Sequence, residues 1–175
     1  MNKRIKIDFV SDMSCPCCVI GLKSLEEALR RVADQVMADM RFQPFELNPQ
    51  LAAAGEGITE HLKEKYGATA EQSELNREAI RARDAEVGFR FKMDKRDRVY
   101  NTFDAHRLLH WAGLEGRQQA LKHALFEAYF SAGKNPSDRD VLVDITAAVG
   151  LNGARAKYSL RACMPRKFAN ANVFI

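Results

Sequence analysis

Cys15-Pro16-Cys17-Cys18 lies between a short apolar run, Ile5 to Val10, and an amphipathic segment that begins near Val19. Two cysteines separated by two residues, at the junction of a predicted strand and a predicted helix, indicate a redox-active dithiol. The same spacing indicates, less strongly, one half of a metal site or two ordinary buried cysteines. We therefore expect the function of the chain to lie at this junction.

The position of Cys15 predicts how such a dithiol works. Pro16 suits the first turn of a helix, so Cys15 is expected at the N-cap, where unpaired backbone N–H groups face its sulfur. This field favours an anion, and we predict a Cys15 thiolate with a lowered pKa that attacks disulfides. Cys18, one turn later, is placed to resolve the mixed disulfide. Cys15 is thus the predicted nucleophile and Cys18 its resolving partner.

Cys17 complicates this arrangement. It is expected to project outward from the first turn with no partner in reach, because adjacent residues on a helix do not face each other. Three interpretations stay open: a bystander, a competitor for the mixed disulfide, or a third thiolate that joins Cys15 and Cys18 on zinc. The last is the weakest, since no fourth ligand is supplied nearby.

The length and composition fit one domain with its own core, or one domain that carries an insertion. The chain has 175 residues, of which 46% are hydrophobic. Four cysteines, three of them in one turn, do not form a framework of spaced disulfides, and the N-terminal residues lack the apolar core of a signal peptide. No stretch approaches the roughly 20 apolar residues that span a bilayer. We expect a cytoplasmic protein without a membrane partner.

The net charge of +4 is unevenly distributed along the chain. Residues 145–175 contain five basic and no acidic residues, whereas the first 144 contain 22 basic and 23 acidic ones. The body of the protein therefore has no bias toward nucleic acid, and we expect no nucleic-acid partner.

The first fifty residues predict a β-α-β unit. Apolar and polar residues alternate over residues 5–10 and again over 36–42, which is typical of strands. Between them, residues 19–33 carry apolar side chains three and four positions apart, which indicates an amphipathic helix. So short a crossover predicts two parallel strands joined in the right-handed sense.

After Gln50 the periodicity becomes helical. We predict helices over 58–66, 70–87 with Leu75 and Ile80 inward, 103–112, about 117–131 and 135–149, a brief extended piece over 88–93 and a solvated loop over 95–98. Gly67, Gly113 and Gly150 are expected to end three of these helices. About a hundred residues of helix after a β-α-β unit suggest a helical insertion into an α/β core.

Four motifs carry a resemblance that covers residues 5 to about 155. They are FVSDMSCPCCVIG (9–21), FQPFELNP (42–49), NTFDAHRLLHWA (101–112) and LFEAYFSAGKNPSDRDVL (125–142). In this combination the chain resembles the DsbA-like thioredoxin-fold proteins. The branch concerned holds FrnE-type dithiol oxidoreductases, kappa-class glutathione transferases and 2-hydroxychromene-2-carboxylate isomerases. The FrnE type fits better than the isomerases, which carry Ser where Cys15 stands.

Residues 157–175 form an atypical tail that departs from the family pattern. Over the rest of the chain the resemblance implies an α/β thioredoxin fold, with an N-terminal β-α-β half over residues 1–50 and a large all-helical insertion domain over 51–156 that roofs the active site. It also implies a thiol:disulfide oxidoreductase or isomerase that needs no metal, with Cys15 and Cys18 as its redox pair. Cys17 departs from the aromatic residue usual at that spacer, which puts the usual thiol selectivity in question.

Protein or small-molecule disulfides are the expected substrates, with glutathione as a candidate co-substrate and no resident cofactor. One alternative is a glutathione-dependent isomerase or transferase. Another is a non-enzymatic module that binds zinc or a partner, or an inactive truncated product.

Ser14, Pro16, Cys17, Glu46 and His106 are the residues expected to shape the active site. Glu46 is a candidate proton relay for Cys18, with a solvated strand-end carboxylate as the alternative. His106 and His110 are four residues apart and are expected to share one helix face. The pair could bind zinc or assist the thiolate as a base, and the alternative is packing and capping.

Residues 157–175 differ from the body, because they lack acidic residues, a helical period and caps. The resemblance implies a cis-proline loop, two strands and a helix beyond this point, none of which is recognisable. We therefore expect the C-terminal β-β-α half to be largely missing, and one hypothesis is a frame-shifted reading of the gene. Loss of the cis-proline loop should impair activity, and the strand edge it leaves could be covered by a second copy in a homodimer.

Overall fold

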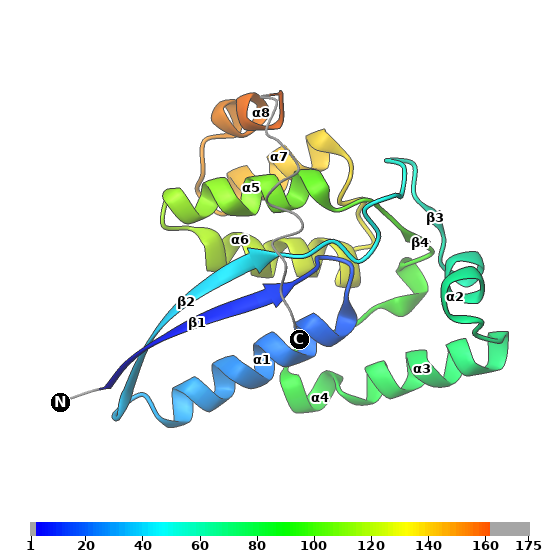
Figure 1. The fold of residues 1–175 in the computed structure, drawn as a ribbon, viewed down its shortest axis with the longest axis horizontal. Helices are drawn as coiled ribbons and strands as arrows, with labels where there is room; N and C mark the ends of the chain where they lie inside the picture. Colours follow the sequence, from blue (N-terminus) through cyan, green and yellow to red (C-terminus); the bar gives the residue numbers. More distant parts are fainter. Residues whose placement is uncertain (1–2, 162–175) are drawn as a thin grey trace.

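The computed structural model describes residues 3–161, which form a β-α-β unit followed by helices (Figure 1). β1 (Lys3–Ser11), α1 (Pro16–Arg31) and β2 (Val36–Pro44) make up this unit. The two strands are parallel, with Lys3 opposite Val36 and Ser11 opposite Pro44. The predicted β-α-β unit is therefore confirmed.

The rest of the described chain is mainly helical. Its elements are β3 (Glu56–Gly57), α2 (Ile58–Tyr66), α3 (Ala70–Ala82), α4 (Asp84–Val87), a 3-10 turn η1 (Met93–Lys95), β4 (Arg98–Val99), α5 (Phe103–Leu114), α6 (Gln118–Phe126), a π-helical turn η2 (Glu127–Ser131), α7 (Arg139–Ala148) and α8 (Gly153–Arg161). β3 and β4 form a short antiparallel pair. In Figure 1, α1 lies along one side of β1 and β2, and α5 and α6 lie along the other.

A single cluster of buried side chains joins the β-α-β unit to the helices. From the unit it includes Met13, Leu22 and Phe42, and from the helical part Leu108, Leu125, Phe126, Tyr129, Phe130 and Leu142. The rings of Phe9 and Phe42 meet edge to face between the two strands. Burial of large apolar and aromatic side chains is the main stabilising term here. The helices therefore share one core with the sheet and hold the N-terminus of α1 in place.

Two helix ends differ in how well the sequence predicts them. Gly67 ends α2 in the left-handed conformation, with φ of 64°, as expected. Gly113, by contrast, lies inside α5, and the left-handed residue that follows this helix is Gly116. The prediction that Gly113 ends the helix was wrong, because a glycine can continue a helix when the following residues still pair with it.

The predicted long helix over 70–87 is broken at Arg83 into α3 and α4. Leu75 was expected to point inward, yet it is 58% exposed, while Ser73 of the same helix is buried. α3 carries too few apolar residues for their pattern to fix its orientation, and the face that it turns inward lines a cavity described below. Residues 88–92 form no strand, although Phe89 and Phe91 are buried.

α8 was not predicted, and it includes the first five residues of the expected tail. Ala156 and Leu160, four residues apart, are buried, and Arg107 donates hydrogen bonds to the carbonyl groups of Ser159 and Leu160. The expectation that the tail lacks helical structure was therefore wrong for residues 157–161. The expectations about residues 162–175, including Cys163 and the missing C-terminal half, lie outside the described residues.

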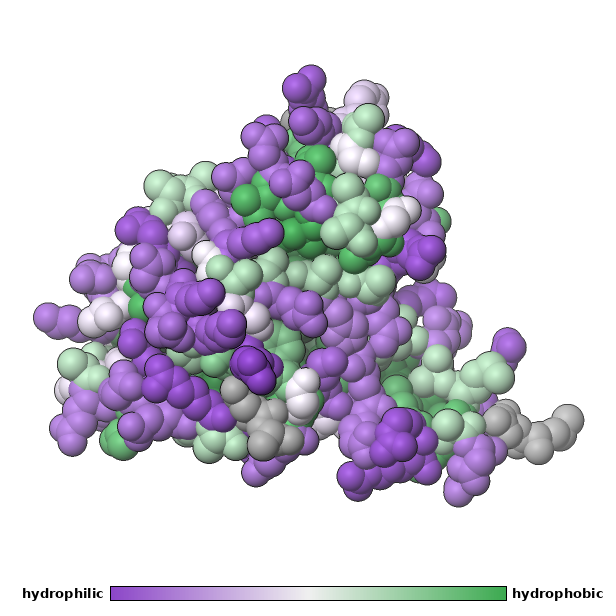
Figure 2. All heavy atoms as spheres, turned by 180° about the vertical axis from the view of Figure 1, so that it is seen from behind, coloured by the Kyte–Doolittle hydropathy of each residue, from purple (hydrophilic) through white to green (hydrophobic). Residues whose placement is uncertain are grey.

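The face shown in Figure 2 is largely hydrophilic, with an apolar area in its upper part. Several large apolar side chains are more than half exposed in the described chain: Met37, Tyr66, Leu75, Leu114 and Tyr158. None of the described helices combines the length and the apolar character that a membrane span requires.

Candidate active site

Cys15 occupies the N-cap of α1, as predicted, with extended backbone angles and Pro16 at the first helical position. The backbone N–H of Cys18 donates to the carbonyl oxygen of Cys15 at 3.1 Å and closes the first turn. Cys15, Cys17 and Cys18 are all free thiols. The local sequence thus places three thiols on one helical turn.

The thiols of Cys15 and Cys18 form a hydrogen-bonded pair. The hydrogen bond to Cys18, followed by burial, raises the pKa of Cys15. The same hydrogen bond lowers the pKa of Cys18, and the positive charge of Lys122 also contributes. The two thiols therefore titrate as a pair.

This arrangement corrects the prediction that the pKa of Cys15 is lowered. The backbone N–H groups of the first turn do act on Cys15 in the expected direction. The hydrogen bond with the nearby Cys18 thiol, together with burial, outweighs them.

Cys17 lies closer to Cys15 than expected. Partial burial raises its pKa first, and the charge of Cys15 and a hydrogen bond with its thiol raise it further. Cys17 is nevertheless exposed, and it lines the same cavity as Cys15. The prediction that it has no partner in reach was wrong, because the Cys15 thiol interacts with it.

Asp12, in the loop between β1 and α1, is a buried carboxylate that organises the start of the helix. Its Oδ1 accepts the N–H of Ser14 at 3.1 Å, and its Oδ2 accepts the N–H of Leu47 at 2.6 Å. Burial alone would raise its pKa, but the facing imidazole of His106 and these two N–H groups more than offset it and lower the pKa. Asp12 thereby ties the Cys15 loop to the segment after β2.

The two histidines of α5 do not share an environment. His106 is buried with its Nε2 3.6 Å from Asp12 Oδ1, whereas His110 is exposed. The prediction that the two histidines share one helix face and could bind zinc together is therefore wrong, because the core covers His106 and leaves His110 exposed. Within residues 3–161, no three histidine, cysteine or acidic side chains gather in a way that could hold a metal ion.

Glu46 is buried, with 5% of its surface exposed, so the alternative of a solvated strand-end carboxylate was wrong. It precedes Leu47, whose N–H binds Asp12. Glu46 does not line the cavity at Cys15. Its suggested role as a proton relay stays a prediction.

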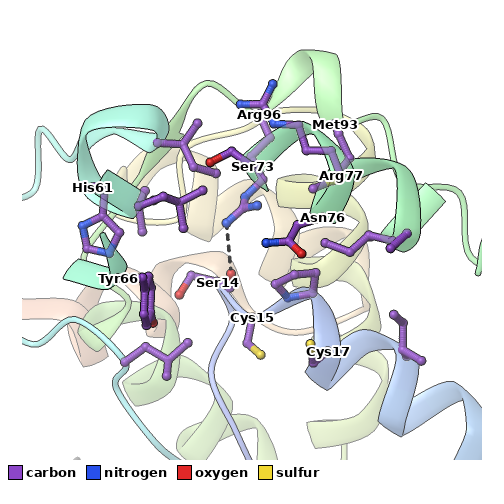
Figure 3. A pocket seen from close by; sticks show the side chains of 18 of the residues that line it. Ser14, Cys15, Cys17, His61, Tyr66, Ser73, Asn76, Arg77, Met93 and Arg96 are labelled. Atoms are coloured by element: carbon purple, nitrogen blue, oxygen red, sulfur yellow. Dashed lines mark hydrogen bonds between the residues drawn. The ribbon is translucent and has the colours of Figure 1, made fainter. Parts of the chain in front are cut away.

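A cavity of about 550 Å³ opens beside the dithiol (Figure 3). Its walls come from the first turn of α1, from α2 and α3, and from the segment around η1: Ser14, Cys15, Pro16, Cys17, His61, Tyr66, Ser73, Asn76, Arg77, Ile80, Arg83, Met93 and Arg96 are among them. Figure 3 shows the α3 side chains across the cavity from Cys15 and Cys17. Cys18 is outside this lining and packs against the core. Only basic and neutral groups line the cavity within the described chain.

Arg96 forms part of the cavity wall, although its segment was predicted to be a solvated loop. The side chain is 9% exposed, and its Nε donates to the Tyr129 hydroxyl at 2.8 Å. Its Nη2 donates to the Ser14 carbonyl oxygen at 3.3 Å, a contact drawn in Figure 3. Its guanidinium also lies over the rings of Tyr129 and Phe130. The prediction failed because the residues that bury Arg96 are distant in sequence.

Lys122 of α6 is a second buried cation that sequence reasoning missed. The residue is completely buried, and its Nζ lies 4.6 Å from the centre of the Phe126 ring. Burial lowers the pKa of Lys122 to about 7, while the charge of Cys18 acts to raise it. A signal was present: Lys122 precedes Phe126 by four residues and Tyr129 by seven, so it falls on the buried helix face.

Comparisons with known proteins agree with this geometry. A family model for the DSBA-like thioredoxin domain matches residues 6–163. The chain is 25% identical over 156 residues to the uncharacterized protein YwbO of Bacillus subtilis, covering 89% of this chain and 72% of that protein. Its structure is similar to that of the probable DsbA oxidoreductase SCO1869 of Streptomyces coelicolor, with a TM-score of 0.83 and 29% identity over 90% of this chain and 68% of the other.

More distant structures share the fold. The cytosolic disulfide reductase DsbM from Pseudomonas aeruginosa, solved with GSH, has a TM-score of 0.62 at 19% identity, with 91% of this chain and 71% of that chain covered. A 2-hydroxychromene-2-carboxylate isomerase has a TM-score of 0.64 at 12% identity, with 90% and 72% covered.

Proposed function

The chain belongs to the family of DSBA-like thioredoxin domains, with an α/β fold rich in helices, and on this premise we propose that it is a thiol:disulfide oxidoreductase or isomerase of the FrnE type. Cys15 attacks the substrate disulfide, and Cys18 resolves the mixed disulfide. The FrnE assignment rests on the motifs, since Cys15 stands where the isomerases carry Ser.

One observation carries the proposal: of the Cys15–Cys18 pair, Cys15 lines the cavity, whereas Cys18 lies outside the lining and packs against the core. A proton that moves along the hydrogen bond from Cys15 to Cys18 leaves the reactive thiolate on the accessible sulfur. Cys18, packed against the core, is protected from external disulfides but stays within reach of Cys15. These are the different requirements of a nucleophile and a resolving thiol.

The reaction balances with the dithiol as the reductant. Cys15 forms a disulfide with one substrate sulfur, while the other leaves as a thiolate and is protonated. Cys18 then attacks the Cys15 sulfur, the second substrate thiol leaves, and a Cys15–Cys18 disulfide remains. Two electrons pass to the substrate, and the reverse sequence oxidises a substrate dithiol.

Trapping tests the assignment of roles. In Cys18→Ala the resolving step is lost, so mixed disulfides through Cys15 should accumulate on incubation with cell extract or oxidised glutathione. Cys15→Ala is the matched control and should capture little. Mass spectrometry of the adducts identifies both the attached sulfur and the captured molecule. If Cys15→Ala captures as much as Cys18→Ala, the proposed roles are wrong.

The proposed substrates are protein or small-molecule disulfides, with glutathione as co-substrate in the cytoplasm. The basic lining of the cavity supports a thiol substrate that carries carboxylate groups. Arg77, Arg83 and Arg96 can attract the carboxylates of glutathione. The distant DsbM structure, described as cytosolic and solved with GSH, has the same fold. Isothermal titration of the Cys15→Ser variant with reduced glutathione measures this binding without exchange.

The same basic cavity favours one alternative, a glutathione-dependent isomerase or transferase. That activity would use glutathione as a cofactor and would not need the Cys15 sulfur. Cys15→Ser should then keep activity, whereas the dithiol mechanism predicts its loss.

Two finer predictions are part of the proposal. We propose the division into residues 1–50, 51–156 and 157–175, and weak activity of the chain. The weak activity can be tested by insulin reduction with the 175-residue protein. A rate comparable to that of an efficient disulfide reductase would contradict it.

We also propose that the chain forms a homodimer. Size-exclusion chromatography with light scattering tests this.

A further inference from the structure

Arg96 differs from the other basic side chains that line the cavity at the dithiol. The residue is 9% exposed, and among the described residues no carboxylate pairs with its guanidinium. Each of the other basic groups in the lining has an acidic partner close to it in the chain. These pairs are His61–Glu56 at 2.8 Å, Arg77–Glu74 at 3.6 Å and Arg83–Glu86 at 2.8 Å.

The contacts that hold Arg96 in the described structure are with neutral groups. Its Nε donates to the Tyr129 hydroxyl at 2.8 Å, and its Nη2 donates to the Ser14 carbonyl oxygen at 3.3 Å. The guanidinium also lies 5.0 Å from the centre of the Tyr129 ring and 5.2 Å from that of Phe130. Dipoles and ring faces stabilise a cation only in part, because a buried charge without an anion stays costly. This wall of the cavity therefore holds a cation and is short of one negative charge.

The same guanidinium is fixed directly beside the nucleophile. Ser14, which accepts the hydrogen bond from Nη2, immediately precedes Cys15, and both residues line the cavity (Figure 3). Within the described chain no hydrogen bond joins the guanidinium to the Cys15 sulfur itself. An anion bound to Arg96 from the cavity would thus lie close to a sulfur that reacts with Cys15.

We propose that Arg96 is a specificity-determining residue that binds a carboxylate of the substrate beside Cys15. The substrates selected in this way are small disulfides that carry carboxylates, such as oxidised glutathione, in preference to neutral or cationic disulfides. This inference rests on the proposed function, because it names the substrate class of that same site.

The chemistry of the side chain favours a carboxylate. A guanidinium presents parallel N–H donors that match the two oxygens of a carboxylate, and such charge-assisted hydrogen bonds are stronger than neutral ones. Tyr129 and Ser14 already orient the group, so little side-chain freedom is lost when a ligand binds. Arg77 and Arg83, which have acidic partners, must share their charge between that partner and a ligand.

The first test uses S-methylglutathione, which has the carboxylates of glutathione but no thiol that can exchange. Calorimetry measures its binding to the reduced wild-type protein, to Arg96→Met and to Arg90→Met, an exposed control. Arg96→Met should weaken binding by about tenfold to a hundredfold, because a charge-assisted contact is lost. Arg90→Met should leave binding unchanged.

The diethyl ester of S-methylglutathione separates a specific contact from a structural one, because both of its carboxylates are masked. The ester should bind the wild-type protein more weakly than the acid does. Arg96→Met should then change ester binding by less than about twofold, because the contact is already absent. If the substitution weakens acid and ester equally, Arg96 is merely structural or acts on the Cys15 sulfur, and the inference is overturned.

Kinetics connect this binding to turnover. Oxidised glutathione, which is anionic, is compared with 2-hydroxyethyl disulfide, which is neutral. Arg96→Met should raise the KM for oxidised glutathione by about tenfold or more and that for the neutral disulfide by less than about twofold. An equal rise for both substrates would contradict a role in selection.

A measurement on the wild-type protein decides the matter even if Arg96→Met fails to fold. The Nε–H signals of the arginines are recorded by NMR, and the Arg96 signal is identified by its absence in Arg96→Lys. It should shift when S-methylglutathione is added and stay in place when the ester is added. An Arg96 signal that responds to neither ligand, or to both alike, would overturn the inference.

The two proposals fail separately. If Cys18→Ala traps nothing through Cys15, the proposed function is wrong, whereas binding of a ligand that cannot exchange still measures the role of Arg96. If trapping succeeds but acid and ester bind alike, the proposed function stands and Arg96 does not select the substrate.

Discussion

The Nε2 atom of His106 lies 3.6 Å from Oδ1 of Asp12, and neither side chain exposes more than 4% of its surface. The contact joins α5 to the loop that precedes Cys15. Asp12 also accepts hydrogen bonds from the N–H of Ser14, in the same loop, and from the N–H of Leu47, after β2. The position of Cys15 therefore depends on a buried carboxylate three residues before it.

Asp12→Asn should destabilise the fold by about 1–3 kcal/mol at pH 7, because one of the two backbone N–H groups bound by the buried Asp12 loses its acceptor. The folded-state pKa of Asp12 is lowered from 3.8, so its stabilisation is present above about pH 4 and is lost as the pH falls through the lower folded value. Urea unfolding between pH 7 and 3 should show the difference from wild type shrinking in acid. Asp39→Asn, at an exposed site, is the control. An equal difference at both pH values would contradict this account.

Arg96→Met should destabilise the protein by about 1–3 kcal/mol and change the rate at which Cys15 is alkylated. The variant leaves the Ser14 carbonyl and the Tyr129 hydroxyl without this donor, in a buried wall of the cavity. Chemical denaturation and alkylation of Cys15 measure the two effects. Arg90→Met, on the exposed surface, should change stability by less than about 0.5 kcal/mol. Equal effects in both variants would show that Arg96 has no special structural role.

Cys17→Ala should retain exchange activity, because the Cys15–Cys18 pair is intact. In Cys18→Ala, however, the neighbouring Cys17 thiol can attack the mixed disulfide in place of the missing partner. The double variant Cys17→Ala/Cys18→Ala should therefore accumulate more trapped adduct than Cys18→Ala alone. Mass spectrometry of adduct yield over time measures this. The same yield in both would identify Cys17 as a bystander.

Lys122→Met should raise stability by about 1–4 kcal/mol below pH 7, because an apolar side chain replaces a buried charge. The folded pKa of about 7 lies below the unfolded value of 10.5, so the unfolded state binds more protons between these pH values. Wild-type stability therefore rises with pH through this window. The advantage of the variant should be largest below pH 7 and vanish toward pH 10.5 in denaturant titrations. A pH-independent difference would contradict the buried ionisation.

Gly133→Ala should cost more stability than Gly116→Ala, although both glycines have φ of 68°. At Gly116 an added Cβ meets open space, so only the left-handed backbone penalty of about 1–2 kcal/mol applies. At Gly133 the Cβ would lie 2.4 Å from the carbonyl oxygen of Lys95, next to Arg96. Denaturation midpoints compare the two variants. Equal losses would mean that η1 can move without cost.

The parts of the fold that follow from the sequence are those fixed by neighbouring residues. Alternation predicts β1 and β2, and Pro16 predicts the start of α1, because these features act within one strand or one turn. Leu75 and Gly113 were misjudged for a different reason. Their surroundings depend on which side of a helix meets other segments, and local periodicity carries little of that information when apolar residues are few.

The sequence by itself determined where the dithiol is, which cysteine begins the helix and that the chain starts with a β-α-β unit. Only the tertiary structure decided which charged and polar side chains are buried with this junction, because they come from α5, α6 and the turn at η1. Lys122, Arg96 and His106 are far from Cys15 in the chain and would be solvated in an isolated helix or loop. Packing removes them from water beside the thiols, where low polarity strengthens their charges.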